Sequence, residues 1–328
     1  MKFHHWLLVS LALGLACLTG CSRDNRTRVA FVSNNTAQFW TIAEAGTKKA
    51  EKELPDFKCE FRRPQDGSVN DQKNHIDDLV ARGVKAIAIS INDPDIQTEH
   101  IDSIVDRGIP VITQDNDAPK SKRLCYIGTD NYSAGKEVGK LVKKALPEGG
   151  VIAIFVGKPD PLNARQRRQG VLDELAGEKD AKGPMYGKYE LHGTFYDNTD
   201  ETKAKDNAAD VITKLADQPY VCLIGLWQYN PPAILTAVRE AKKLGTIKIV
   251  GFDEDENTLI GIKEGHIDGT VVQQPFEFGY QSVKLMAQLA KGDKSGLPKD
   301  GILYIPHQVI TKDNVDEFHK KLNELLGK

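Results

Sequence analysis

The sequence predicts an α/β protein with two similar lobes, each built on a parallel β-sheet. Short apolar segments alternate with longer amphipathic segments along most of the 328 residues, which is typical of β-α-β units. The same order of segments occurs a second time, and polar side chains recur where strands end in both halves. Open parallel sheets bind ligands beyond the carboxyl ends of their strands. Two such lobes facing each other would therefore share one cleft.

The first half of this alternation starts at residue 28. Its predicted strands are 28–33, 58–62, 85–91, 109–113 and 125–128, and its predicted helices are 39–54, 69–82 and 96–107. Gly83 and Gly108 follow two of these helices, where glycine commonly ends a helix, and Pro110 stands at the start of a strand. These signals indicate β-α-β units of ordinary length.

The second half repeats the plan. Its predicted strands are 151–156, 188–195, 221–226, 247–252 and 269–273, and its predicted helices lie near 164–176, 201–217, 231–244 and 256–264. VKAIAISINDPD in the first half corresponds to YVCLIGLWQYNPP in the second, and IPVITQDND corresponds to IKIVGFDEDE. The tail adds a helix at 276–291, a strand near 302–310 and a helix at 313–326. To use these last elements the chain must pass between the lobes more than once, so we expect discontinuous domains.

The N-terminus has the features of an export signal. A polar start precedes an apolar run from Trp6 to Leu18, which is too short to span a bilayer as a helix. The run ends in Leu-Thr-Gly-Cys, which resembles the box of bacterial lipoproteins, where the cysteine is lipidated and becomes the new N-terminus. We therefore expect a signal peptide at 1–20, a lipid on Cys21 and a tether at 21–27; the alternative is a buried N-terminal helix. One lipidated residue would anchor the chain to a membrane without crossing it.

Charge and cysteine content exclude several classes of protein. The 44 basic and 46 acidic residues are nearly balanced, which gives no electrostatic basis for binding nucleic acid. Cys59, Cys125 and Cys222 each lie in an apolar, strand-like segment, and no CxxC spacing occurs. A disulfide framework or a zinc site is therefore not expected, and buried free thiols are.

Candidate binding residues follow the predicted strands of both halves. They are Asn35, Phe39, Trp40, Asp115 and Asn116 in the first half, and Arg165, Tyr196, Trp227, Asn230, Asp253 and Gln273 in the second. Carboxylates and amides satisfy hydroxyl groups, an arginine donates two parallel hydrogen bonds, and aromatic faces suit the C–H faces of a small ring. The combination favours a neutral ligand with many hydroxyl groups.

Six of these candidates also have a purely structural explanation. Asp115, Asn116 and Asp253 could form turns in which the side chain bonds the backbone at a strand end. Arg165 could start a solvated helix. In the same way, Trp227 could belong to the core, and Asn230 could cap the helix that begins at Pro231. Their recurrence at equivalent ends of both halves favours the binding interpretation.

Catalytic motifs are absent from the sequence. It has no GxSxG, HExxH or P-loop pattern, no GxGxxG after a strand, and no ligand spacing among its eight histidines. Asp115 and Asp253 could form the acid–base pair of a glycosidase, which leaves a carbohydrate-processing enzyme as a minor alternative. We expect a protein that is not an enzyme and has no cofactor or metal.

Several segments together resemble the periplasmic sugar-binding proteins of ABC transporters, in the ribose-binding branch of the type 1 periplasmic binding fold. VAFVSNNTAQFW, LVARGVKAIAISINDPD, GIPVITQDNDA and YIGTDNYSAGKEVGKLV resemble consecutive segments of that family. NARQRRQGVLDEL, NPPAILTAVREA and VGFDEDENTLIGIKEGHIDGTVVQQPFEFGYQSV continue the resemblance, which covers residues 28–312. It implies two Rossmann-like lobes joined by a hinge of several strands, crossing near Thr129-Asp130, Gln273 and Ile305.

The resemblance also implies roles for the candidate residues. Phe39 and Trp40 would stack on one face of a sugar, and Tyr196 would stand where another stacking ring does. Asp115, Arg165, Asn230, Asp253 and Gln273 would hydrogen-bond its hydroxyl groups. Ala37 stands where ribose binders have a hydrogen-bonding asparagine, and Asn116 stands where they have an arginine. These two departures put ribose itself in doubt.

The implied function is that of a monomeric, lipid-anchored solute-binding protein, periplasmic or on the cell surface. It would close around a monosaccharide and deliver it to the permease of an importer whose ATPase is a separate chain, because this chain has no P-loop. The alternative is a sensor that presents a sugar or furanose to a chemoreceptor or sensor kinase. The expected lobes are 28–129 plus 274–305, and 130–273 plus 306–328.

Overall fold

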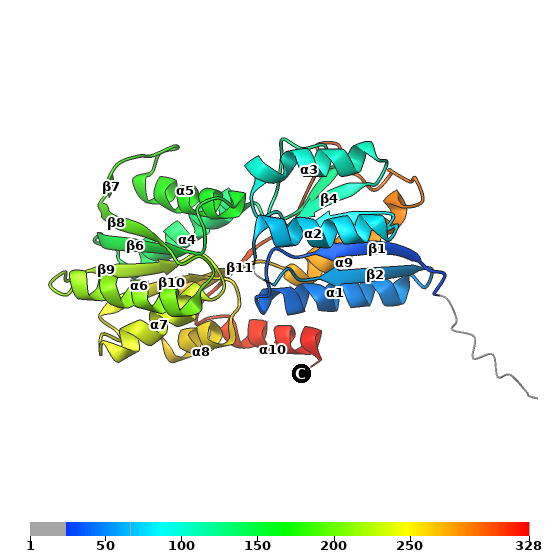
Figure 1. The fold of residues 1–328 in the computed structure, drawn as a ribbon. Coiled ribbons are helices and arrows are strands. Elements are labelled where there is room, and N and C mark those ends of the chain that lie inside the picture. Colours follow the sequence, from blue (N-terminus) through cyan, green and yellow to red (C-terminus); the bar gives the residue numbers. More distant parts are fainter. Residues whose placement is uncertain (1–23, 66, 328) are drawn as a thin grey trace, which may run out of the picture.

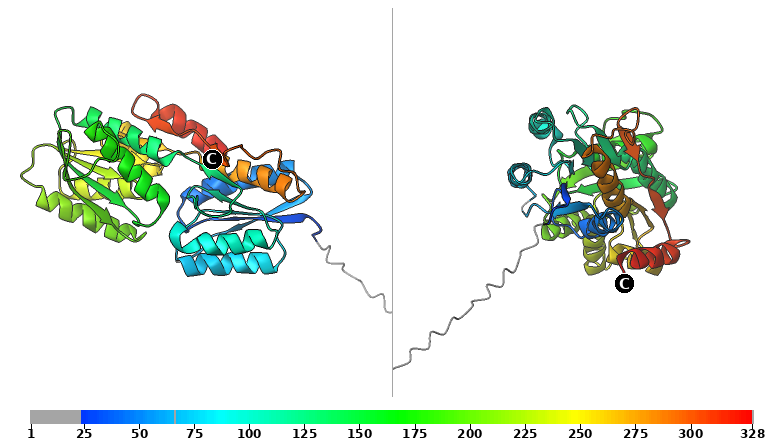
Figure 2. Two further views of the ribbon diagram at one scale, coloured as in Figure 1. Left: turned by 90° about the horizontal axis from the view of Figure 1, so that it is seen from above. Right: turned by 90° about the vertical axis from the view of Figure 1, so that its right-hand side faces the viewer.

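The computed structural model describes residues 24–65 and 67–327, so the predicted signal peptide and Cys21 lie outside the described residues. The elements form two lobes side by side, each with a central sheet between layers of helices (Figures 1 and 2). Within these ranges, no helix is both long and apolar enough to cross a membrane. The predicted α/β class, with two parallel-sheet lobes, is confirmed.

The first lobe has a six-stranded parallel sheet in the order β12-β5-β4-β3-β1-β2. Its strands are β1 (Thr27–Val32), β2 (Phe57–Arg62), β3 (Ile87–Ile89), β4 (Val111–Gln114), β5 (Cys125–Gly128) and β12 (Ile302–Tyr304). Its helices are α1 (Phe39–Glu53), α2 (Val69–Ala81), α3 (Pro94–Asp106) and α9 (Pro275–Leu289). One apolar cluster lies between the sheet and α1 with α9, and another between the sheet and α2 with α3.

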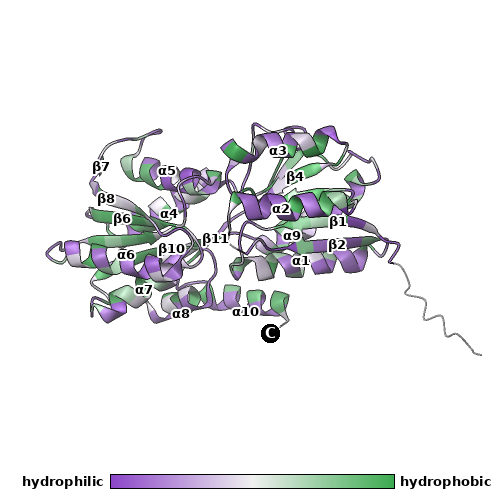
Figure 3. Ribbon diagram, in the orientation of Figure 1, coloured by the Kyte–Doolittle hydropathy of each residue, from purple (hydrophilic) through white to green (hydrophobic). Residues whose placement is uncertain are grey.

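The second lobe has a seven-stranded sheet in the order β13-β11-β10-β9-β6-β8-β7. Its strands are β6 (Gly150–Val156), β7 (Met185–Tyr186), β8 (Tyr189–Tyr196), β9 (Val221–Gly225), β10 (Ile247–Phe252), β11 (Gly269–Val272) and β13 (Gln308–Ile310). Its helices are α4 (Asn131–Ala145), α5 (Leu162–Ala176), α6 (Glu201–Lys214), α7 (Asn230–Glu240), α8 (Glu256–Glu264) and α10 (Val315–Leu326). Only the edge strands β7 and β13 pair antiparallel. Inner strands such as β9 and β10 are mostly hydrophobic, as expected for strands covered on both faces (Figure 3).

In the described chain, three short segments pass from one lobe to the other. They are residues 129–130 between β5 and α4, residues 273–274 between β11 and α9, and residues 305–307 between β12 and β13. The last of these corrects the single strand predicted at 302–310, which is two strands in different sheets. Pro306 lies at the break, because proline has no N–H for a strand ladder.

Helix α4 and the two-residue strand β7 are not among the elements predicted from the sequence. Helix α4 contains Gly135 and Gly139, which count against a helix when propensity alone is considered. Their function is in the packing of α4 on α5. A Cβ atom on Gly135 would lie 2.3 Å from the backbone oxygen of Arg167, so only glycine allows the two helices to approach this closely.

The prediction of buried free thiols is confirmed. Cys59 in β2, Cys125 in β5 and Cys222 in β9 are all free and buried. Burial raises the pKa of the Cys125 thiol to about 11, so this sulfur is not a reactive thiolate at neutral pH.

Candidate functional site

A cavity lies between the two lobes, where the carboxyl ends of strands from both sheets meet. It is lined by Asn34, Asn35, Ala37, Phe39, Trp40 and Asp115 of the first lobe, and by Asn163, Arg167, Trp227, Gln228, Tyr229, Asp253 and Gln273 from the other side. The cavity leaves about 50 Å³ for the centres of water molecules. Since one water needs only about 10–15 Å³ of such space, the cavity suits a small ligand and not a polymer.

The aromatic wall of the cavity comes from the first turn of α1. The rings of Phe39 and Trp40 are both buried and meet edge to face, with centroids 5.0 Å apart. The indole N–H of Trp40 donates to Oδ1 of Asn35 (3.0 Å), which also accepts from the backbone N–H of Ala37 (2.8 Å). Asn35 therefore fixes the loop and the indole ring, and its carbonyl oxygen is already bonded within the protein.

Two buried carboxylates face the cavity from opposite lobes. Asp115 follows β4 and accepts a hydrogen bond from the Ser90 hydroxyl (2.8 Å), and burial raises the pKa of its carboxyl. Asp253 follows β10 and accepts from the amide of Gln273 (2.9 Å). Burial raises the pKa of Asp253 to about 6, although the nearby Arg167 lowers it. Both carboxyl groups therefore lack the hydration that would normally stabilise their charge.

The cation of the site is Arg167, whose side chain is almost completely buried. Its guanidinium lies 3.8 Å from the ring centroid of Phe252 and 3.9 Å from a carboxylate oxygen of Asp253. Its Nε donates to the side chain of Asn131 (2.8 Å), and its Nη1 donates to the backbone oxygen of Leu226 (3.0 Å). These contacts hold the guanidinium of Arg167 in one orientation and leave its Nη2 for another acceptor.

Five lining residues each keep one buried polar atom without a hydrogen-bond partner in the part of the chain that the structure describes. These atoms are the side-chain oxygens of Asn34, Asn163 and Gln273, Nη2 of Arg167 and the indole N–H of Trp227. Buried polar atoms are normally bonded, because leaving one unpaired costs about 1–3 kcal/mol. Three acceptors and two donors around one small cavity are the complement of a ligand that both donates and accepts, as hydroxyl groups do.

The lobes touch each other at the mouth of this cavity. Among the hydrogen bonds that cross between them are Phe39 N–H to Gln228 Oε1 (3.0 Å), Asn163 N–H to Asn116 Oδ1 (3.0 Å), and Lys158 Nζ to the backbone oxygen of Gly67 (2.9 Å). The structure therefore has the lobes in a closed arrangement around the cavity.

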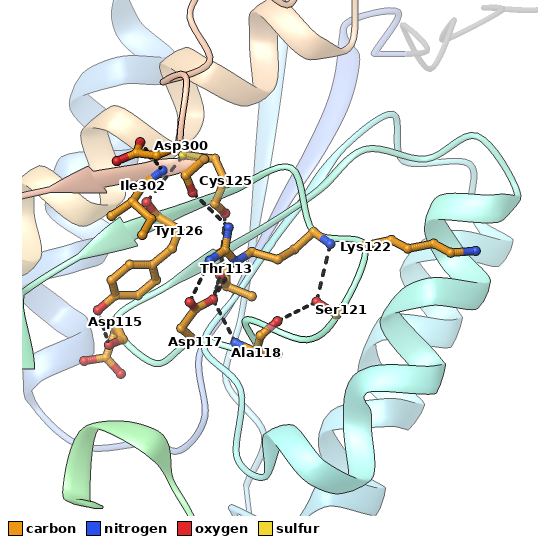
Figure 4. A network of polar contacts seen from close by, with 12 residues as sticks. Thr113, Asp115, Asp117, Ala118, Ser121, Lys122, Cys125, Tyr126, Asp300 and Ile302 are labelled. Atoms are coloured by element: carbon orange, nitrogen blue, oxygen red, sulfur yellow. Dashed lines mark hydrogen bonds and ion pairs between the residues drawn. The ribbon is translucent and has the colours of Figure 1, made fainter. Parts of the chain in front are cut away.

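The loop that carries Asp115 is itself held by an ion pair (Figure 4). Arg123 donates to both carboxylate oxygens of Asp117, at 2.7 and 2.8 Å, and the Thr113 hydroxyl donates to the same group (2.5 Å). The Tyr126 hydroxyl donates to the backbone oxygen of Asp115 (2.9 Å). This network fixes the backbone at the point where the carboxylate of Asp115 turns toward the cleft.

Comparison with known proteins identifies the family. The family model described as the periplasmic binding protein domain matches residues 29–294. The chain belongs to this family. The ribose import binding protein RbsB of Haemophilus influenzae is 24% identical over 289 residues, which cover 88% of this chain and 93% of the relative. The D-galactose/methyl-galactoside binding periplasmic protein MglB of the same organism is 27% identical over 334 residues, which cover 95% and 96%.

Solved structures agree with this membership. An ABC transporter solute-binding protein from Burkholderia graminis, in complex with D-arabinose, matches with a TM-score of 0.80 and 28% identity, and the match covers 89% of this chain and 98% of that chain. The expected type 1 periplasmic binding fold is thus confirmed.

Arg165, a predicted residue of this periplasmic binding protein, does not line the cavity. The Arg165 side chain is half exposed and pairs with Asp95 across the mouth of the cleft (3.5 Å). Asn163 and Arg167 line the cavity instead, because residues four positions apart share a helix face and a residue midway between them does not. The arginine that lines the cavity is Arg167, two residues further along α5.

Three other predicted residues lie beside the cavity without lining it. Asn116 joins the lobes through the Asn163 N–H and also donates to the backbone oxygen of Ile91. Asn230 is fully buried, where it accepts from the backbone N–H of Trp227 (3.0 Å) and donates to Asp197 (2.9 Å). These asparagines hold the loops of the site in position.

Tyr196 is the third, at the exposed end of β8. The aromatic rings on this side of the cavity are those of Trp227 and Tyr229, and the Tyr229 hydroxyl donates to Asp197 (2.5 Å). Asp197 thus accepts hydrogen bonds from both Tyr229 and Asn230 and holds them in position.

The remaining predicted residues do line the cavity, and five further lining residues were missed. The placed residues are Asn35, Phe39, Trp40, Asp115, Trp227, Asp253 and Gln273, and the missed ones are Asn34, Asn163, Arg167, Gln228 and Tyr229. All five missed residues lie within two positions of a predicted one. The strand-end signal therefore located the loops but did not identify every side chain that turns inward.

Proposed function

We propose that this chain is an extracytoplasmic solute-binding protein that binds one monosaccharide in the cavity between its lobes. The observation that carries the proposal is the set of five lining residues with an unpaired buried donor or acceptor. A sugar offers hydroxyl groups to all five, to the carboxylates of Asp115 and Asp253, and a C–H face to the rings of Phe39 and Trp40. A site that hydrogen-bonds each hydroxyl group also rejects analogues that lack one.

The proposal includes delivery of the sugar to an ABC-type importer from a membrane-anchored position. Support comes from the names of the relatives, which are import or periplasmic binding proteins for ribose and galactose. The lipid would be carried by Cys21, followed by a tether at 21–27. The lobes would move as units of 28–129 plus 274–305 and of 130–273 plus 306–328, with the bound sugar favouring the closed state.

Titration calorimetry of the purified chain tests the binding proposal. A panel of pentoses, hexoses and polyols is compared with a panel of amino acids. We expect saturable binding of one or a few monosaccharides, recovered chemically unchanged, and a rise in the midpoint of thermal unfolding with sugar concentration. Binding of an amino acid with no response to any carbohydrate would refute the sugar assignment.

The anchor has a separate test. In a bacterial host, the wild-type chain is expected in the membrane fraction, and the Cys21→Ser variant in the soluble extracytoplasmic fraction. Equal distribution of the two chains would refute the anchor and leave the binding proposal untouched.

A further inference from the structure

A second cavity lies beside the hinge, between α10 and the start of α9. It has a volume of about 250 Å³ and is lined by Ile42, Glu254, Gln273, Gln274, Pro275, Phe276, Glu277, Gln308, Phe318, Lys321, Leu322 and Leu325. Helix α10, red in Figure 1, lies next to α8 and also contacts α1 of the other lobe. Both lobes and the hinge therefore contribute to the walls.

The walls of this hinge cavity are mostly apolar. Ile42 comes from α1 and Phe276 from α9, while Phe318, Leu322 and Leu325 come from α10. Leu325 is half exposed, and the two phenylalanines are only partly buried. An apolar group of the size of one ring would remove this surface from water.

A carboxyl group with no partner lies at the inner end of the hinge cavity. Glu254 is only 4% exposed, and neither of its carboxyl oxygens has a hydrogen-bond partner in the described chain. Burial, and then the neighbouring charge of Asp253, raise the pKa of Glu254 well above its ordinary value. A buried carboxyl is normally paired, because isolating a charge from water is expensive.

The charges around the hinge cavity favour a cation as its occupant. Glu254 and Glu277 both line it, and among the described residues Glu277 accepts only from a neutral amide, Nε2 of Gln281 (2.9 Å). The one cationic side chain of the lining is Lys321, whose ammonium already donates to Glu317 (2.5 Å). A positive ligand would meet two carboxyl groups and a lysine that is already paired with Glu317.

We propose that the hinge cavity is a second binding site, for a small organic cation with an apolar body. A bound ammonium favours the ionised form of the Glu254 carboxyl group and pairs with it, and the apolar body packs against Phe276 and Phe318. This site is separate from the sugar cavity, although Gln273 lines both. For that reason Glu254, and not Gln273, is the residue to change in a test.

The test is titration calorimetry of the full purified chain with 2-phenylethylamine as the probe. The matched ligand is 2-phenylethanol, which has the same ring and chain length and no charge. The chains are wild type, Glu254→Gln, and Glu324→Gln as a control that removes one carboxylate from the exposed side of α10. A fourth chain, Leu325→Arg, places a positive charge at the exposed edge of the cavity.

Saturable binding of the amine by wild type and by Glu324→Gln is expected. Affinity should fall about tenfold to a hundredfold in Glu254→Gln, as for the loss of a hydrogen bond to a charged group, and should also fall in Leu325→Arg. Equal affinity for the alcohol and the amine would overturn the assignment of a cation. Unchanged amine binding by Glu254→Gln, or no amine binding by wild type, would overturn the site.

Discussion

The two lobes hold one aspartate each at the same place in their sheets. Asp115 and Asp253 directly follow β4 and β10, and both have left-handed backbone conformations, with φ of 60° and 68°. The backbone N–H of Asp115 donates to Ile127 of the neighbouring strand (3.1 Å), and that of Asp253 donates to Val271 (2.8 Å). Non-glycine residues seldom adopt this conformation, and aspartate is among those that tolerate it best.

The likeness extends to the carbonyl groups of the two aspartates. The Tyr126 hydroxyl donates to the backbone oxygen of Asp115, and the Thr270 hydroxyl donates to that of Asp253, both at 2.9 Å. Tyr126 and Thr270 each stand one residue before the partner of the N–H bond. The repeat that is visible in the sequence therefore includes the same local structure in both lobes: a left-handed aspartate whose backbone N–H and carbonyl are both bonded to the neighbouring strand.

The two lobes differ in what surrounds the carboxylates. Asp115 accepts from Ser90, which is neutral, whereas Asp253 accepts from Gln273 and lies near Arg167. Arg167 also lowers the pKa of Asp115 from across the cleft. Arg167 is part of one lobe but acts on carboxylates of both, so the candidate site is complete only when the lobes are closed.

Removing that shared cation is the most severe test of the comparison. In Arg167→Ala, both carboxylates lose their counter-charge, and we expect sugar affinity to fall at least about a hundredfold and stability by about 3 kcal/mol. Calorimetry and thermal unfolding measure the two effects. Arg165→Ala is the matched control, since its side chain is half exposed outside the cavity. Wild-type binding by Arg167→Ala would show that the cation is not shared.

Neutralising the aspartates one at a time compares the lobes directly. Asp115→Asn and Asp253→Asn should each weaken sugar binding about tenfold to a hundredfold, because each removes charged acceptors from hydroxyl groups. Dissociation constants from calorimetry give the two losses. Similar losses would mean that the lobes contribute equally, and no loss in either variant would contradict the assignment of both residues.

The pH dependence should separate Asp253 from Asp115. In the sugar-free protein Asp253 has a pKa of about 6, against an ordinary value of 3.8, so between these values the folded chain binds more protons than the unfolded one. Stability from this group is therefore present at low pH and is lost as pH rises toward 6. Sugar hydroxyl groups favour the ionised carboxylate, so sugar affinity should rise as pH increases through about 6.

Calorimetry at a series of pH values measures this dependence. Asp253→Asn should remove the part of the rise that is centred near pH 6, and Asp115→Asn should retain it. A rise that persists in Asp253→Asn would assign the proton to a different group.

The smallest effect is expected at the exposed mouth of the cleft. The Arg165–Asp95 pair links the lobes at 3.5 Å, but about half of each side chain is exposed. Asp95→Asn should weaken sugar binding less than about threefold, and the difference should disappear at high salt. A loss as large as that of a buried aspartate would mean that this pair, and not the buried charges, holds the lobes closed.

The loops of the site could be predicted because the ends of buried strands are visible in the sequence. Strands β4, β10 and β11 end at Gln114, Phe252 and Val272, each within one residue of its predicted end, and the next residue in each case lines the cavity. The choice between Arg165 and Arg167 depends on how α5 is rotated against its sheet. Helix α5 has no clear apolar stripe, so its sequence does not reveal that rotation.

Contacts between the lobes were also beyond prediction from the sequence. Asn116 was expected to bond a ligand, and its carbonyl oxygen instead accepts from the Asn163 N–H of the opposite lobe. The two residues are far apart in the chain, and only the closed arrangement brings them together. Local patterns contain no information about such a pairing.

The three buried cysteines make each lobe its own reporter of unfolding. Cys59 and Cys125 lie in the sheet of the first lobe, and Cys222 lies in a central strand of the second. A thiol reagent reaches these sulfurs only when the sheet around them opens, so the rate at which each is modified measures how often its own lobe opens. Thiol modification of a chain with no engineered label can thus show which lobe unfolds first, and whether a bound sugar makes the two lobes unfold together.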